Sequence, residues 1–167
     1  MAATFTLISS VTVGSGGAAS MGFTSIPATY TDLLVKTSTR GGSAHIANDI
    51  ILSFNGSNAN FTGKLLYGNG ASAVSGNAGN AIGLYVGANA TASTFSNGEY
   101  YIPNYTSSNY KSTSADDVSE NNATTAYQYL IASLWSQTAA ITSITLTPTS
   151  GSFVQYSTAY LYGISNA

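Results

Sequence analysis

The side chains that could perform acid–base or nucleophilic chemistry are few and widely spaced. The 167-residue chain has four Lys and Arg, six Asp and Glu, one His and no Cys. His45 and Asp49 are four residues apart, as a helical pair would be, but the segment around them has no helical periodicity. A catalytic dyad also needs a positioned nucleophile, and nothing singles one out among the many Ser and Thr residues. We predict that His45 is a loop residue near the start of a strand and that no residue is catalytic.

The acidic cluster of the chain consists of Asp116, Asp117 and Glu120, with Asn121 and Asn122 beside it. Such a run could offer several oxygen ligands to a hard cation such as calcium. It lacks the spaced ligands and the glycine of an EF-hand loop. A solvated turn or a polar contact with a neighbouring subunit is favoured, and we predict no metal ligand, no cofactor-binding residue and no cofactor.

Two further enzyme classes are disfavoured. The glycine-rich stretches lack the Lys-Ser/Thr pair of a P-loop and the strand–helix setting of a dinucleotide site, so we interpret them as turns. A glycan-cleaving enzyme needs two carboxylates facing each other across a cleft. The acidic cluster is too compact in sequence for that, although Glu99 could approach it in the fold. The chain is therefore predicted not to be an enzyme.

The composition indicates a structural or binding protein. Charged residues make up 6% of the chain, and hydroxyl, amide and aromatic side chains take their place. The hydrophobic fraction of 44% is enough for a core, and a formal charge of −2 argues against capture of nucleic acid, which needs clustered Lys and Arg. No stretch has the length of a membrane span, and the first residues lack the basic and apolar regions of a secretory signal. We expect synthesis in a cytoplasm. We also expect self-association, because a weakly charged surface repels its copies little.

Alternation of apolar and polar residues predicts the fold. About ten short strands are separated by turn signals, and no window has helical periodicity. This pattern is typical of an all-β, antiparallel β-sandwich of jelly-roll type, which we predict to be one domain over residues 1–167. Asn55-Gly56 predicts a hairpin between strands at 48–54 and 61–67, and residues 68–80 are expected to be a loop. The polar strand at 111–119 is expected on an outer sheet face.

The aromatic residues allow two interpretations. Twelve Tyr and six Phe could fill a sandwich core, or some could stack on sugar rings or anchor protein interfaces. Tyr127, Tyr129 and Trp135 are assigned to the core or to subunit contacts because they lie in apolar strands. The other tyrosines considered for either role are Tyr100, Tyr101, Tyr105, Tyr110, Tyr156, Tyr160 and Tyr162.

Several segments are similar to those of a known family. Residues 23–35 read FTSIPATYTDLLV and lead into a Ser-x-Arg ending at Arg40, and residues 54–56 read FNG. Near the carboxyl end come AAITSI at 139–144, FVQYS at 153–157 and YLYGI at 160–164. In this order they resemble small virion structural proteins of tailed bacteriophages, which are capsid decoration proteins or tail-fibre modules. The resemblance covers most of the chain and implies a β-sandwich with neither a cofactor nor a nucleophile.

The resemblance and the composition together predict a phage capsid decoration, or cement, protein. It would bind the major capsid protein on the outer surface of the virion and stabilise the head by bridging capsid subunits, as a homotrimer, without nucleic acid or membrane as partners. The alternative is a tail-fibre or appendage protein that recognises a host-surface glycan. The amino-terminal strand and the 68–80 segment are the expected contact regions, because both are uncharged.

Overall fold

The computed structural model describes residues 4–123 and 125–165, which form strands and turns and contain no helix. The all-β prediction is confirmed, with twelve strands in place of about ten. They are β1 (Phe5–Thr12), β2 (Met21–Phe23), β3 (Asp32–Thr39), β4 (Ala47–Phe54), β5 (Phe61–Gly68), β6 (Ala73–Asn77), β7 (Ala81–Val86), β8 (Ser96–Ile102), β9 (Lys111–Glu120), β10 (Ala126–Trp135), β11 (Ile144–Pro148) and β12 (Thr158–Ile164).

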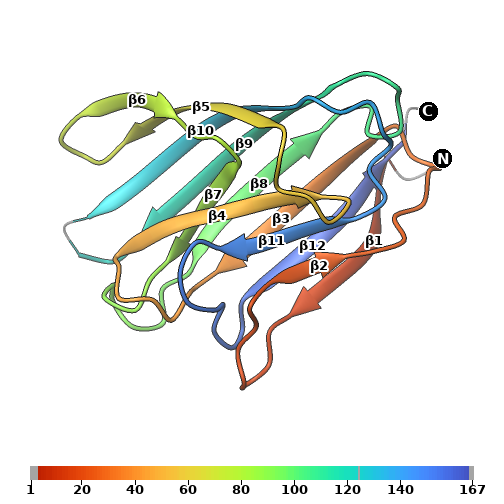
Figure 1. Cartoon of the computed structure of the whole chain (residues 1–167). Helices are drawn as coiled ribbons and strands as arrows, with labels where there is room; N and C mark the ends of the chain where they lie inside the picture. The colour runs from red at the N-terminus through yellow and green to blue at the C-terminus, as the bar shows by residue number, and fades with distance from the viewer. Residues whose placement is uncertain (1–3, 124, 166–167) are drawn as a thin grey trace.

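The strands form two packed antiparallel sheets (Figure 1). One has eight strands in the order β1-β12-β3-β8-β9-β10-β5-β6, and the other has four in the order β2-β11-β4-β7. From β1 to β4 and again through β7, β8, β11 and β12, the chain alternates between the sheets, which is the winding of a jelly roll. The hairpins β5–β6 and β9–β10 are insertions into this winding. They lie beside β8 and widen one sheet into a wing that the four-stranded sheet covers only in part.

The sheets touch closely at one end of the wing. Phe54, at the end of β4, packs against Phe61 and Trp135, with ring centroids 5.4 and 5.3 Å away. These three rings belong to the hydrophobic core between the sheets or pack against it. From there β4 and the wing strands diverge, so that the opposite end of the sandwich is open, as Figure 1 shows on its left side.

The Asn55-Gly56 turn forms, but the hairpin predicted from it is wrong. Both residues have positive φ, 52° and 77°, and Phe54 and Ser57 exchange two backbone hydrogen bonds across the turn. The chain then crosses to the other sheet, so β4 pairs with β11 and β7, and β5 pairs with β10 and β6. The Asn55 side chain is used for another contact: its Oδ1 accepts hydrogen bonds from the amides of Thr142 and Ser143. Local turn chemistry specified the bend and not the partner strand.

The polar strand β9 was expected on an outer sheet face, and this is correct for only half of its residues. Its residues alternate strictly between buried and exposed along Lys111–Glu120. The inward set includes Lys111, Thr113, Asp117 and Ser119, all nearly inaccessible to solvent. A central strand therefore contributes mostly polar side chains to the interior, which requires polar partners there.

Strand β7 provides a polar partner for one of these residues, Asp117. It is one of the two edge strands of the four-stranded sheet, yet every residue from Ala81 to Val86 is buried. An edge strand covered by another sheet needs partners for its free backbone groups. The Leu84 carbonyl accepts hydrogen bonds from Ser96 Oγ at 2.8 Å and Thr39 Oγ1 at 3.3 Å. The Leu84 amide faces the Asp117 carboxylate, which explains why an acid lies in the interior.

Two glycines make room for this carboxylate. A Cβ on Gly98 would lie 2.3 Å from Asp117 Oδ2, and one on Gly83 would lie 2.4 Å from the same atom. Both positions are in strand interiors, where glycine otherwise weakens the sheet. The glycines are therefore explained by the space that the buried acid needs.

We expect Gly98→Ala to lower the free energy of unfolding by about 1–3 kcal/mol, because the added methyl group must displace Asp117 or bend β8. Gly68→Ala in β5 is the matched control, since a Cβ there meets nothing within 4 Å. Urea denaturation of both variants measures the difference. Equal stability of the two variants would contradict this explanation of Gly98.

Candidate docking surface

The strand geometry of β9 separates the acidic cluster. Asp116 is exposed on the outer face, whereas Asp117, the next residue, points into the interior and is fully buried. Glu120 is exposed at the end of the strand, and its Oε1 accepts a hydrogen bond from the Asn122 amide. No group of three His, Asp or Glu side chains among the described residues could hold a metal ion. The cluster is therefore not a single site in space.

His45 lies in the loop that precedes β4, as predicted, and its side chain is exposed. The backbone carbonyl of His45 accepts a hydrogen bond from the Asn89 amide at 3.1 Å. Asp49 is the third residue of β4 and is half-buried. The Asp49 carboxylate makes no hydrogen bond or ion pair with another described residue, so nothing joins the two side chains into a dyad.

Asp117 belongs to a buried hydrogen-bond chain. The Tyr100 hydroxyl donates to Asp117 Oδ2 at 3.0 Å and lies 3.2 Å from Thr37 Oγ1. Burial raises the pKa of Asp117 well above its usual value, an effect that the Leu84 amide and the Tyr100 hydroxyl partly offset. Burial and the Asp117 charge raise the pKa of Tyr100 as well. Because Thr37, Tyr100 and Asp117 are all buried, we interpret this hydrogen-bond network as structural.

Lys111 is a buried cation that sequence reasoning missed. The Lys111 ammonium donates to the carbonyls of Ser107, Asn109 and Ala139 at 2.6, 2.8 and 2.7 Å, and Thr138 O lies 3.2 Å away. It also lies 5.8 Å from the centre of the Trp135 ring, within range of a cation–π contact. Lys111 therefore ties the loop before β9 to the segment after β10. The alternation of β9 could have predicted its burial, because Lys111 is on the same face of the strand as Ala115.

The outer face of the eight-stranded sheet carries most of the remaining charges. Lys36 Nζ and Glu99 Oε2 form an ion pair of 2.7 Å with both side chains 52% exposed. Glu99 lies directly opposite Asp116 in the sheet register, so the approach that the sequence allowed for does occur. Both acids are exposed and stand on the sheet face, and one is paired with a lysine. They do not form the facing pair of a desolvated acid and a nucleophile that glycan cleavage requires.

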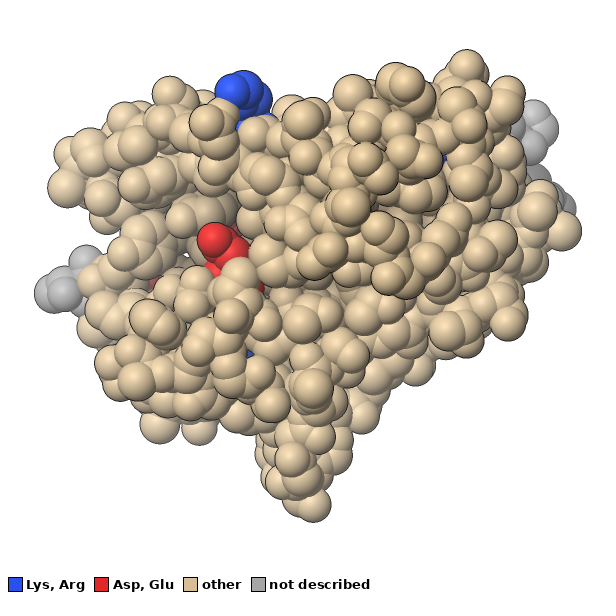
Figure 2. Space-filling view, in the orientation of Figure 1, with Lys and Arg blue, Asp and Glu red and all other residues tan. Residues whose placement is uncertain are grey.

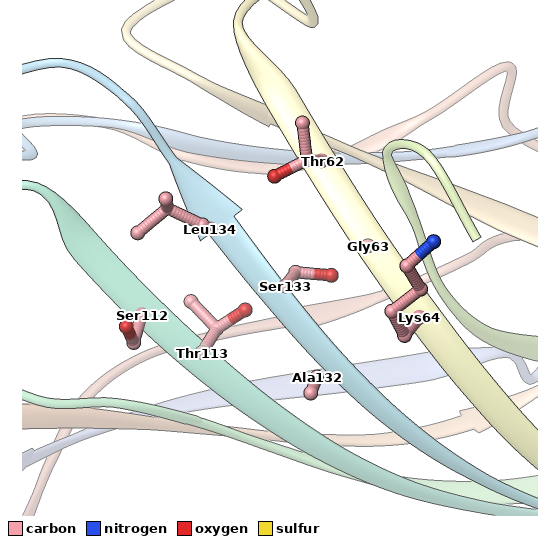
Figure 3. Close-up of a pocket in the computed structure, with 8 residues that line it drawn as sticks. All are labelled: Thr62, Gly63, Lys64, Ser112, Thr113, Ala132, Ser133 and Leu134. Carbon is pink, nitrogen blue, oxygen red and sulfur yellow. The ribbon is translucent and has the colours of Figure 1, made fainter. Parts of the chain in front are cut away.

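Apolar side chains flank this charged strip, and we name the face formed by the outward residues of β1, β12, β3, β8, β9, β10 and β5 the outer face. Leu66 and Leu130 are 49% and 48% exposed and lie opposite each other on β5 and β10. At the other end, Phe5 and Leu7 of β1 are more than half exposed, next to Tyr160 and Tyr162. A close-up of the wing shows a hollow across β5, β10 and β9, where Ser133 lies between Leu134 and Lys64 and Ala132 lies farther along β10 (Figure 3).

Contiguous exposed apolar residues usually mark an interaction surface. Sequence reasoning missed Leu66 and Leu130, but a signal was available. Leu65-Leu66 and Leu130-Ile131 are consecutive apolar pairs within strands, and consecutive residues of a strand point to opposite faces. One member of each pair has to face outward.

The tyrosines divide between the two roles considered for them. Tyr100, Tyr105 and Trp135 are buried, which confirms the core assignment of Trp135. Tyr127 and Tyr129 face inward but are only half-buried. Tyr101, Tyr110, Tyr156 and Tyr160 are exposed, and Tyr162 is half-buried. The Tyr101 hydroxyl donates to Asp32 Oδ2 at 2.8 Å, so this exposed residue has an internal anchor.

Neither a family model, nor a curated protein, nor a solved structure matches the chain. The resemblance to phage virion proteins therefore stays a prediction, and the function is argued from the surface itself. The described residues also contain no helix of the length and hydropathy needed to cross a bilayer.

We expect Asp117→Asn to stabilise the protein increasingly as the pH rises above 3.8, the usual value for an aspartate. A raised pKa in the folded state means that folding favours the protonated acid, so this contribution is complete below 3.8 and is lost as the pH rises through the folded-state pKa. Asparagine stays neutral throughout. The difference in unfolding free energy should grow by up to about 1.4 kcal/mol per pH unit within that window.

Urea denaturation of both proteins at a series of pH values measures this difference. A gap that stays constant between acidic and neutral pH would show that Asp117 does not titrate differently in the folded and unfolded states.

Proposed function

We propose that this protein is a phage capsid decoration (cement) protein, not an enzyme, that binds the outer surface of the capsid and stabilises the head by bridging capsid subunits. The observation that carries the proposal is the outer face, where exposed leucines and aromatic residues flank one strip of charge on a broad sheet. The resemblance in sequence and the jelly-roll winding support the same class. The titratable groups of the described chain are dispersed or structural, which fits a protein that acts by binding.

The mechanism is burial of surface. Covering a half-exposed leucine contributes about 1 kcal/mol, from the transfer of its apolar area out of water. A ligand that binds the assembled shell and not the free subunits stabilises the shell by its binding free energy. A β-sandwich suits this role because ordering it on the shell costs little conformational entropy compared with ordering a flexible segment. Contacts repeated over the shell then add to its resistance against internal pressure.

A homotrimer fits the free edges of the sheets. Strand β1 lies at one edge of the eight-stranded sheet and exposes Phe5 and Leu7. An uncovered edge with apolar residues invites pairing with another chain, so we assign the contact between copies to β1. The expected loop at 68–80 instead holds β6, which pairs with β5 and forms the opposite edge. Three linked copies would bind the shell more tightly than one through effective concentration.

The double variant Leu66→Glu with Leu130→Lys is expected to abolish binding to capsids, because burying two charged side chains against an apolar contact costs several kcal/mol. Both positions are solvent-exposed in the free protein. The lysine would lie between Asp116 and the new glutamate in the register, so the fold is retained. Tyr110→Glu is the control because Tyr110 is 58% exposed in the loop before β9, away from the leucine pair. Co-sedimentation with particles that lack the protein measures occupancy, and full occupancy by the double variant would contradict docking through this face.

The copy number in mature particles tests the location independently. Quantitative mass spectrometry should give this chain an abundance comparable to that of the major capsid protein. A trace abundance would overturn the decoration proposal and place the protein in the tail.

A further inference from the structure

The four-stranded sheet and the wing diverge at one end of the sandwich, where the inner side of the wing is only partly covered (Figure 1). Figure 2 shows the surface hollowed there, between the β5–β6 hairpin and β4, with an acidic side chain inside the hollow. This cleft is distinct from the outer face, because it is lined by the inward side of the same wing strands. Nothing in the proposed decoration role uses it.

Three tyrosines form one wall of the cleft. Tyr67 of β5 and Tyr129 of β10 lie directly opposite each other in the register, with ring centroids 5.1 Å apart. Tyr127 lies two residues before Tyr129 on the same face, and its ring is 6.3 Å from that of Tyr129 and 6.4 Å from that of Tyr67. All three are half-buried, and their hydroxyls make no hydrogen bond to any described residue. They form a continuous aromatic surface with three free hydroxyl groups.

Asp49 is close enough to this wall for its charge to act on the Tyr129 hydroxyl. Its backbone lies opposite Leu84 of β7, the strand whose free edge faces β9. Burial raises the pKa of Asp49. Burial, followed by the charge of Asp49, raises the pKa of Tyr129 to about 12, so its hydroxyl stays protonated at any physiological pH.

Among the described residues, no lysine or arginine side chain is available to the cleft. Lys36 is paired with Glu99 on the outer face, and Lys64 donates to Asn77. Lys111 is bound to loop carbonyls, and the Arg40 guanidinium donates to the carbonyls of Ala90, Thr91 and Thr94. These four are all the Lys and Arg residues in the sequence. A phosphorylated, sulfated or acidic ligand would therefore meet the Asp49 carboxylate without a lysine or arginine to balance its charge, which disfavours that class.

The spacing of the rings also decides against a quaternary ammonium ligand. An aromatic cage holds a cation between ring faces, with each face within about 6 Å of the charge. Here the rings touch one another at 5.1–6.4 Å, so no space for an ammonium group remains between them. They offer a platform instead of a cage.

We propose that the cleft lined by Tyr67, Tyr127, Tyr129 and Asp49 binds a neutral oligosaccharide. Sugar rings present apolar C–H faces that pack on aromatic rings, and hydroxyls that need polar partners. The three phenol groups donate and accept hydrogen bonds, and the Asp49 carboxylate accepts charge-assisted bonds from two sugar hydroxyls. The inference does not depend on the decoration role, because it concerns the isolated chain.

The test is titration calorimetry of the purified protein with maltohexaose, cellohexaose and chitohexaose, up to about 10 mM, since single sugar sites of this kind bind weakly. Binding of at least one is expected. Tyr67→Ser and Asp49→Asn should each weaken it at least about tenfold, the loss of roughly 1.4 kcal/mol of contacts. Asp49→Asn keeps the side-chain shape, so it remains informative if the tyrosine variant unfolds.

Tyr110→Ser is the matched control, because it removes an exposed tyrosine outside the cleft and should leave affinity unchanged. No heat of binding with any of the three sugars would overturn the proposal. Sugar affinity equal to that of the wild type in both cleft variants would also overturn it. Saturable binding of choline instead of the sugars would overturn it as well. Each result can be read without capsids, so failure here leaves the decoration proposal standing.

Discussion

The buried edge of β7 is the constraint on which the rest of the interior depends. Laying an edge strand on the face of another sheet removes its backbone groups from water, and these groups must be paired inside the protein. Ser96, Thr39 and Asp117 meet that need at Leu84, and Gly83 and Gly98 keep the space open. The buried acid on the inward face of β9 is thus a consequence of where β7 ends its sheet.

The two inserted hairpins turn a regular jelly roll into a protein with three different surfaces. The eight alternating strands account for the closed sandwich, whereas β5–β6 and β9–β10 extend one sheet past the cover of the other. Because the sheets diverge from the contact of Phe54 with Phe61 and Trp135, the wing has an inner face that is only half covered. The aromatic wall, the exposed leucines and the free edge at β6 all come from these insertions.

The sequence predicts the fold class well because alternation is a local property. The strands predicted at 48–54 and 61–67 are observed as β4 and β5, each within one residue of the expected bounds. Strand pairing is not local, which is why the Asn55-Gly56 turn was placed correctly and its partner strand was not. The cluster at Asp116 and Asp117 shows the same limit: only the inward parity of β9 reveals that neighbouring acids belong to different environments. Tyr67 lies opposite Tyr129 because β5 pairs with β10, and no local sequence pattern predicts that strand pairing.

The wing strands carry the exposed leucines on one face of a single sheet and the tyrosines of the cleft on the other. On β5 the outward Leu66 is followed at once by the inward Tyr67, and on β10 Tyr129 is followed at once by Leu130. A slip of one residue in the pairing of these strands would exchange the two sets, exposing rings where the leucines stand and placing leucines in the cleft. An insertion or deletion within β5 or β10 would therefore disrupt both surfaces at once. A change in the length of the turns that join these strands would leave both surfaces in place.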